Sequence, residues 1–97
     1  MDKKILYLSN LYDYYGTLLT DKQQEYFEDY YFNNLTLAEI AENNSISRNA
    51  IHKQIKEVEN KLEYFEEKLN LLKKREKLEK IIKNLDKKIK QEIEELI

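Results

Sequence analysis

Apolar side chains recur along this chain at the three- and four-residue intervals of an α-helix. Near the N-terminus one helical face would carry Ile5, Leu8, Tyr12 and Tyr15, and this spacing predicts a first helix over residues 3–15. Gly16 follows at once, where helices often close with a residue of left-handed conformation. We therefore expect Gly16 to end the first helix in that conformation.

Two capping boxes predict where the next helices begin. In such a box a Thr side chain accepts a hydrogen bond from the third helical residue, and a Glu or Gln at that position reaches back to the Thr backbone. Thr20 with Gln23 would start a helix over about residues 21–33, and Thr36 with Glu39 would start a short one. The inner faces of these two helices would hold Gln23, Phe27, Tyr30, Tyr31, Leu37, Ile40 and Ala41.

Asparagines indicate where these helices stop. We expect a break at Asn33-Asn34 and a tight turn at Asn43-Asn44-Ser45. An asparagine would take the positive φ of that turn, because Asn tolerates the left-handed region better than most residues. Ser47 would then cap the following helix.

A long stripe of apolar residues follows Ser47 at alternating four- and three-residue intervals. It comprises Ile51, Ile55, Val58, Leu62, Phe65, Leu69 and Leu72. Such a heptad pattern is typical of a helix that packs along a partner. We therefore expect a homodimer whose interface is Val58, Leu62, Phe65, Leu69 and Leu72.

The apolar pattern is interrupted at Lys73-Lys74-Arg75-Glu76-Lys77 and resumes from Leu78 to Leu96. The chain thus ends in two long amphipathic segments, which form either one helix with a phase shift or an antiparallel hairpin, and residues 70–77 are where a bend would fall. The fold class is all-α, with a tri-helical helix-turn-helix head and a long amphipathic helical C-terminal extension. We divide it into a helix-turn-helix domain, residues 1–72, which includes the start of the long helix, and a C-terminal amphipathic helix, residues 73–97.

Composition narrows the range of functions. The chain has one Gly, no Pro and no Cys among 97 residues, so helix breakers are scarce and a disulfide scaffold or a Cys-ligated zinc site is excluded. The single histidine, His52, excludes a His-rich metal site. Carboxylate pairs fall on outward helical faces, where nothing would raise a pKa for catalysis. We expect no enzyme, no cofactor and no metal.

The N-terminal residues lack the apolar core of a signal peptide, and no run is long enough to span a membrane. We expect a cytoplasmic protein without membrane insertion. The eleven aromatic residues fall mostly on inward stripes, which favours core packing over base stacking. Tyr14 and Tyr26 are the exceptions that we expect to be exposed.

The net charge of −2 hides an uneven distribution. Residues 1–44 hold three basic and eight acidic side chains, whereas residues 45–97 hold fourteen basic and eleven acidic ones. Nine basic side chains against three acidic ones lie within residues 73–90. That stretch is interpreted either as a solvated helical face or as a surface for an RNA backbone or a membrane.

The segment from Leu37 to Ile55 has the pattern of a helix-turn-helix. Ala41 would let the second helix cross closely, and Ile46 and Ile51 would fill the angle between the helices. The second helix would present Ser47, Arg48, Asn49, His52, Lys53 and Lys56 away from the core. Arg and Asn can contact base edges in the major groove and Lys can contact phosphates, so these six residues are the predicted nucleic-acid interface.

Two alternatives to nucleic-acid binding stay open for this face. Polar residues at these positions could be solvated without any ligand, and helix-turn-helix units also serve as protein-docking modules. Glu57 and Glu59 flank the basic residues and weaken their attraction for phosphate. The alternative function is therefore an adaptor module that binds a protein partner and not nucleic acid.

Several motifs resemble those of one bacterial family. The run Tyr15-Gly16-Thr17-Leu18-Leu19-Thr20-Asp21-Lys22-Gln23 resembles the YGxLLTxKQ signature of the YlxM family. Further likeness lies in Leu37-Ala38-Glu39-Ile40-Ala41-Glu42, Ser47-Arg48, Ile55-Lys56 and Glu66-Glu67-Lys68-Leu69. The resemblance covers about residues 5–72. It implies a small regulatory helix-turn-helix protein whose DNA-reading motif is similar to that of sigma factors.

The resemblance also implies partners. Proteins of this family are associated with the signal recognition particle pathway, so components of that particle are expected partners beside DNA or structured RNA. The chain departs from the family pattern at Asn44 and Ser45 in the turn, and at His52, Lys53 and Glu57 on the second helix. His52 and Lys53 make that helix more basic than the family pattern, and Glu57 makes it less so.

Overall fold

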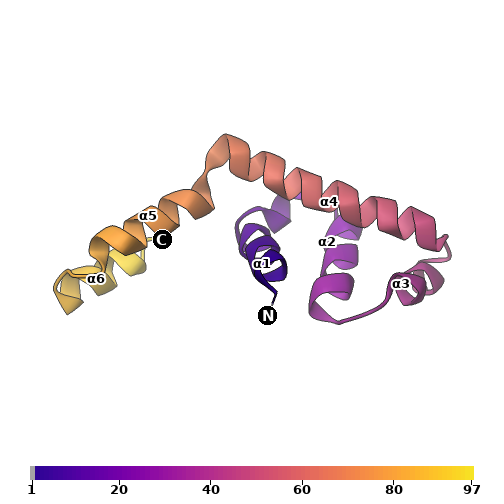
Figure 1. Cartoon of the computed structure of the whole chain (residues 1–97), viewed down its shortest axis with the longest axis horizontal. Helices are drawn as coiled ribbons and strands as arrows, with labels where there is room; N and C mark the ends of the chain where they lie inside the picture. Colours follow the sequence, from indigo (N-terminus) through magenta and orange to yellow (C-terminus); the bar gives the residue numbers. More distant parts are fainter. Residues whose placement is uncertain (1) are drawn as a thin grey trace.

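A computed structural model describes residues 2–97, which are helical apart from short connections (Figure 1). The elements are α1 (Lys3–Tyr15), a 3₁₀ turn η1 (Gly16–Leu18), α2 (Asp21–Phe27), a π-helical turn η2 (Glu28–Phe32), α3 (Leu37–Asn44), α4 (Arg48–Leu69), α5 (Leu71–Ile82) and α6 (Lys87–Glu94). Figure 1 shows α1, α2 and α3 against one side of α4, while α5 turns away and α6 folds back along it. The all-α prediction is confirmed.

The first helix has the predicted bounds, but Gly16 does not close it as expected. Its φ of −55° and ψ of −38° are right-handed, and the chain continues into η1. A Cβ at this position would lie 3.0 Å from the Tyr12 ring, which is closer than side chains normally pack. Tyr12 stacks on Phe27, with 4.4 Å between ring centroids. Glycine therefore serves the close approach of Tyr12 and not a left-handed turn.

Both predicted capping boxes are present. The Thr20 hydroxyl accepts from the Gln23 N–H at 3.2 Å, and the Gln23 amide oxygen accepts from the Thr20 N–H at 3.2 Å. Thr36 and Glu39 make the same pair of bonds, both at 3.1 Å. Two of the four unpaired N–H groups at each helix start are satisfied in this way.

The predicted helix over residues 21–33 changes its winding before it ends. From Glu28 on, the backbone widens into a π-helical turn, in which the Asn33 N–H donates to the Glu28 carbonyl at 2.9 Å. Asn34 then has a φ of 55°, which confirms the break. Widening turns Tyr30 and Tyr31 toward α3 and α4, where both pack against the core.

The turn after α3 is formed by a different residue from the one predicted. Ser45 has the positive φ of 55°, while Asn43 and Asn44 belong to α3. The Asn44 amide donates to the Ile40 carbonyl at 2.8 Å, which holds Asn44 inside the helix. Ile46 comes directly after the left-handed residue and is 39% exposed, so it does not fill the angle between the helices. Ile51 does, and it is fully buried.

Two buried clusters form the core of the head. The larger comprises Leu8, Leu11, Tyr15, Leu19, Phe27, Val58, Leu62 and Leu72. The smaller comprises Tyr26, Ile40, Ala41, Ile51 and Ile55. Tyr26 is only 8% exposed and Tyr14 is partly buried, so the expectation that both are exposed is wrong. Tyr26 points into the space between α2, α3 and α4.

The predicted heptad stripe, which runs along α4 to Leu72 at the start of α5, is covered mainly by helices of the same chain. Val58, Leu62 and Leu72 are buried against α1 and α2, and Phe65 packs on the same cluster. Only Leu69 of the five predicted dimer residues is exposed. Because α1 and α2 occupy the stripe, it cannot at the same time be the face of a homodimer, and this location of the interface is corrected.

The chain bends at Asn70, the first residue of the stretch 70–77 in which a bend was expected. Asn70 has a φ of 55° and separates α4 from α5. Glu66 bridges the bend, since its carboxylate accepts from the Tyr15 hydroxyl at 2.6 Å and from the Leu72 and Lys73 N–H groups at 3.1 and 3.0 Å. Neither arrangement predicted for the end of the chain is present as such, because α5 turns away from α4 without folding back on it (Figure 1). The single helix predicted over residues 73–97 is instead two helices, α5 and α6, which fold back on each other with residues 83–86 as the loop.

One buried tyrosine, Tyr15, and two partly buried ones, Tyr12 and Tyr31, predict a loss of stability at alkaline pH. Burial and the hydrogen bond to Glu66 raise the pKa of Tyr15 to about 12, and burial with bonds to Glu28 and Glu59 raises the pKa of Tyr12 and Tyr31. Their contribution is complete below pH 10 and is lost as the pH rises through the folded-state pKa. Urea unfolding followed by circular dichroism should show stability falling above pH 10.

Lysine side chains titrate in the same pH range and also change stability. A pair of variants distinguishes the contribution of the tyrosines from that of the lysines. Tyr15→Phe should reduce the number of protons released on unfolding at pH 11 by about one, which is read from the slope of stability against pH. The exposed Tyr64→Phe should leave that slope unchanged. Equal slopes in the two variants would contradict the assignment.

Candidate nucleic-acid interface

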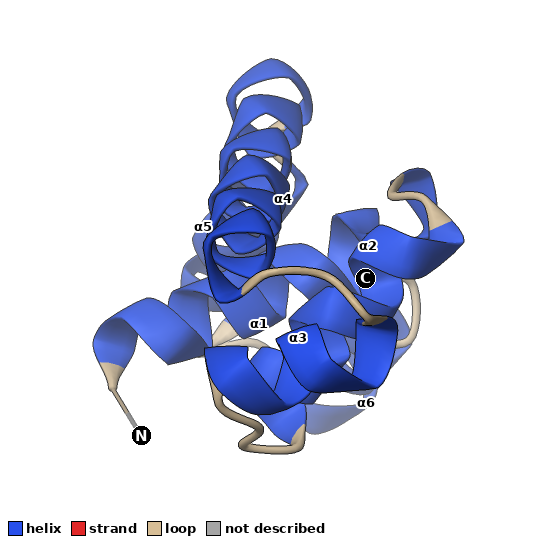
Figure 2. Cartoon of the chain, turned by 90° about the vertical axis from the view of Figure 1, so that its right-hand side faces the viewer, coloured by secondary structure: helices blue, strands red, loops and turns tan. Residues whose placement is uncertain are grey.

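The helices α3 and α4 pack against each other at the end of the head farthest from the tail (Figure 1), and this end faces the viewer in Figure 2. Ile40 and Ala41 of α3 lie against Ile51 and Ile55 of α4 in one buried cluster. The connection is short, residues 45–47, and is fixed by the Ile46 N–H donating to the Ala41 carbonyl at 3.1 Å. Ser47 caps α4 as predicted, accepting from the Ala50 N–H at 3.1 Å.

The six predicted interface residues are all exposed. Ser47, Arg48, Asn49, His52, Lys53 and Lys56 occupy the turn and the first turns of α4. At 100° per residue, the direction of Asn49, Lys53 and Lys56 is opposite to that of the buried Ile51 and Val58. Asn49, Lys53 and Lys56 therefore share one solvent-facing side with His52 at its edge, whereas Arg48, exposed in the first turn, lies between that side and the buried one. The structure places them together and leaves their binding role as a prediction.

A buried carboxylate marks the end of this basic side. Glu59 is 8% exposed and accepts a hydrogen bond from the Tyr31 hydroxyl. The ammonium groups of Lys56 and Lys4 lie 3.6 and 3.7 Å from its carboxylate. Glu59 thus partly neutralises Lys56, whereas no ion pair engages Arg48 or Lys53 within residues 2–97. On the basic side of α4, the positive charge without an acidic partner is therefore that of Arg48 and Lys53.

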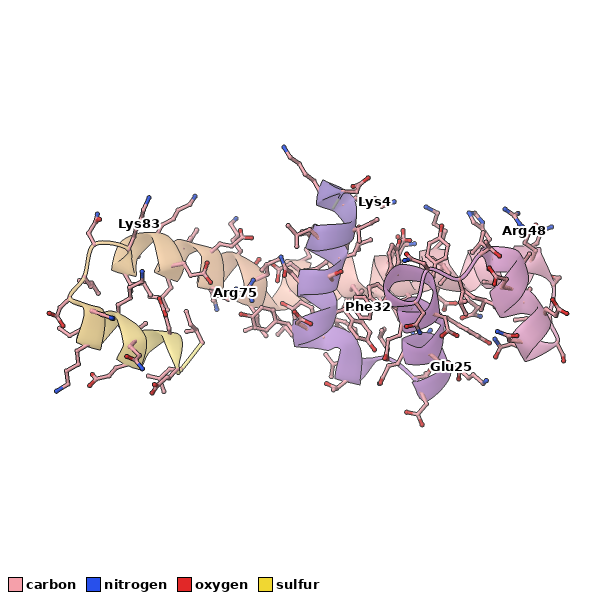
Figure 3. The ribbon with its side chains drawn as sticks, turned by 90° about the horizontal axis from the view of Figure 1, so that it is seen from below. Lys4, Glu25, Phe32, Arg48, Arg75 and Lys83 are labelled. Atoms are coloured by element: carbon pink, nitrogen blue, oxygen red, sulfur yellow. The ribbon has the colours of Figure 1, made fainter. Side chains whose placement is uncertain are left out.

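Lys4 is a neighbour of the site that the sequence reasoning missed. It lies on α1, far from α4 in the sequence, and no spacing or motif connects the two segments. An open cleft of about 580 Å³ joins them; it is lined by Lys4, Ile5, Tyr30, Tyr31, Asn34, Leu35, Thr36, Leu37 and Arg48. Figure 3 shows Lys4 and Arg48 toward the same edge of the molecule. The cleft therefore carries one cation from α1 and one from α4.

The opposite edge of the head is acidic. A shallow hollow of about 280 Å³ on α2 and η2 is lined by Asp21, Gln24, Glu25, Glu28, Asp29 and Asn33. Glu25 lies on the edge away from Lys4 and Arg48 in Figure 3. This separation of charge would orient the head on a polyanion, with α4 toward it and α2 away from it.

These elements define a helix-turn-helix protein. It has a short helix, a three-residue turn and a second helix whose first turns are exposed and basic. The chain belongs to the UPF0122 family, whose model, described as "Putative helix-turn-helix protein, YlxM / p13 like", matches residues 2–97. The family resemblance predicted from the motifs is thereby confirmed.

Relatives from several bacteria agree with this assignment. A UPF0122 protein of Thermoanaerobacter sp. (strain X514) is 48% identical over 90 residues, which cover 89% of this chain and 77% of the relative. One from Malacoplasma penetrans is 48% identical over 95 residues, covering 92% and 89%. One from Fusobacterium nucleatum is 42% identical over 94 residues, covering 80% and 91%. Within residues 2–97, no helix is both long and apolar enough to cross a lipid bilayer.

Proposed function

We propose that this protein binds nucleic acid through the first turns of α4 and acts as a non-catalytic regulatory or accessory factor. The main support for the proposal comes from Arg48 and Lys53. Both side chains are exposed, and neither forms an ion pair with an acidic side chain of the described residues. They lie at the N-terminal end of the second helix of a helix-turn-helix, the part that enters the major groove in DNA-binding proteins of this class.

The side chains differ in what they can contribute. Arg48 and Asn49 can each form two hydrogen bonds with a base edge, so they would supply sequence preference. Lys53 is a point charge suited to phosphate, and Lys56 and Lys4 would add phosphate contacts once they are released from Glu59. His52 and Ser47 lie between these groups and would contact the backbone or a base edge.

Removal of the two unpaired cations should weaken binding strongly. Fluorescence anisotropy with labelled duplex DNA and with a structured RNA, at low salt, should show binding by the unmodified chain. Arg48→Ala combined with Lys53→Ala should weaken it by about 100-fold, because a bidentate base contact contributes about 1–3 kcal/mol and a phosphate contact adds to it.

A matched control removes the same charge elsewhere. Lys22→Ala with Lys68→Ala changes two exposed lysines away from α4's first turns and should weaken binding only slightly. If neither nucleic acid binds at low salt, or if both double variants bind alike, the proposed interface is wrong. Absence of all binding would favour the protein-docking alternative.

As the cellular setting we propose the signal recognition particle pathway, which is supported by the family resemblance alone. Binding of the purified chain to purified particle components, measured by anisotropy or sedimentation, tests this setting separately. Binding to duplex DNA without binding to any component of the particle would contradict the setting and leave the nucleic-acid proposal intact.

A further inference from the structure

The cleft between α1 and the start of α4 has the composition of a site for a small organic group. Its volume of about 580 Å³ falls within the range of roughly 300–1,000 Å³ that such sites have. Five of its nine lining residues are apolar or aromatic, and the other four are two cations, an asparagine and a threonine. The proposed function uses the cations of this cleft and gives its apolar wall no role.

Two tyrosines form the aromatic part of this wall, and they differ in how they are held. The Tyr31 ring lies 4.7 Å from the Phe27 ring between centroids, and the Tyr31 hydroxyl donates to Glu59, so both its ring and its hydroxyl are engaged. Tyr30 is half-buried and meets Tyr31 edge to face, with 5.0 Å between centroids and 81° between planes. In such a pair each ring has at most one face against the other, so at least one face of Tyr30 is not covered by Tyr31. Tyr30 is therefore the ring on which a second planar group can stack.

The charges around this wall suit an anion that is attached to a planar group. Lys4 enters the cleft from α1 and Arg48 enters it from α4, and no acidic residue of the described chain lines it. Two carboxylates next to the lining residues are already engaged, since Glu39 caps α3 and Glu59 bonds to Tyr31 and to two lysines. A nucleotide has both of the required parts, a planar base and a phosphate.

We propose that the cleft holds one unpaired nucleotide of the bound nucleic acid, with its base on Tyr30 and its phosphates beside Lys4 and Arg48. This role of the cleft rests on the proposed function, since Arg48 belongs both to the cleft and to the predicted interface on α4. A base within a duplex is stacked between its neighbours and cannot enter, whereas a bulged or looped base is free to leave the stem. Because every base has a face that stacks, the cleft selects an unpaired position and not a sequence. We therefore expect a preference for a paired stem that carries an unpaired nucleotide.

Fluorescence anisotropy with three labelled stems of the same sequence tests the proposal on the unmodified chain. The first stem is fully paired, the second carries a bulged adenosine and the third carries an abasic bulge, and each is prepared as RNA and as DNA. The adenosine bulge should bind about tenfold more tightly than the abasic bulge, which is the effect expected of one base stacked on an aromatic ring. The abasic bulge keeps the extra phosphate and the flexible backbone, so the ratio of the two affinities measures the base alone. Comparison of RNA with DNA shows which of them supplies the nucleotide.

Variants at Tyr30 test the stacking ring. Tyr30→Leu should bring the ratio to about one and leave the affinity for the paired stem unchanged, whereas Tyr30→Phe should keep the ratio. Tyr64→Leu removes an exposed tyrosine elsewhere on α4 and should keep the ratio as well. Circular dichroism confirms that each variant keeps its helices.

The outcomes separate this role of the cleft from the proposed function. Equal binding of the adenosine and abasic bulges by the unmodified chain, or an unchanged ratio in Tyr30→Leu, would overturn the role of the cleft. Binding of the paired stem would in that case leave the proposed function intact. Absence of binding to all three stems would overturn both.

Discussion

Replacing Leu62 by alanine should lower the free energy of unfolding by about 3 kcal/mol, the usual cost of a leucine truncated in a packed core. Leu62 is fully buried and lies in the cluster that α1 and α2 form with α4. The variant leaves a cavity that the surrounding aromatic side chains cannot fill without moving. Urea denaturation followed by circular dichroism measures the change.

The control for this prediction lies on the same heptad stripe. Leu69→Ala removes an equal volume from an exposed position and should cost less than about 1 kcal/mol. Neither variant should change the monomer–dimer equilibrium at concentrations where the chain is folded. Dissociation of a dimer by Leu62→Ala, without loss of stability, would show that the stripe faces a second copy after all.

Replacing Glu66 by alanine should lower the free energy of unfolding by about 1–3 kcal/mol, because three donors lose their acceptor at once. These donors are the Tyr15 hydroxyl and the N–H groups of Leu72 and Lys73. Glu66 thereby caps the start of α5 across the left-handed Asn70 and connects α1 to the bend. Loss of the carboxylate should loosen the tail where it leaves the head.

Hydrogen exchange distinguishes this role from general destabilisation. In Glu66→Ala the amides of Leu72 and Lys73 should exchange faster than in the unmodified chain, by a larger factor than the amides of α3. Glu67→Ala, at the exposed neighbouring position, should change neither stability nor exchange. Equal acceleration throughout the chain would contradict a local capping role for Glu66.

Helix starts were predictable because they depend on residues close in sequence. The capping boxes at Thr20 and Thr36, the cap at Ser47 and the bounds of the first helix follow from local hydrogen bonds and from apolar periodicity. The same local rules identified the exposed side of α4. The exposed side of α4 consists of the positions that do not belong to its buried apolar stripe.

Features that depend on distant contacts were not predictable from one sequence. Apolar periodicity shows that the α4 stripe is covered, but it cannot show whether α1, α2 or a second copy covers it. The interrupted apolar pattern places a bend within residues 70–77, but not at one residue of that stretch. The bend is at Asn70, where Glu66 can satisfy the N–H groups of α5. Lys4 joins the candidate site through the buried Glu59, an ion pair between segments far apart in the sequence.

Salt dependence of nucleic-acid binding tests the central claim most directly. Each phosphate contact contributes about −0.9 to the slope of log affinity against log salt, so Lys53, Lys56 and Lys4 together predict a slope of about −3 on duplex DNA. Lys53→Ala should reduce its magnitude by about 1, while Lys22→Ala should leave it unchanged. A slope near zero, or an equal slope in Lys53→Ala and the unmodified chain, would contradict nucleic-acid binding through α4.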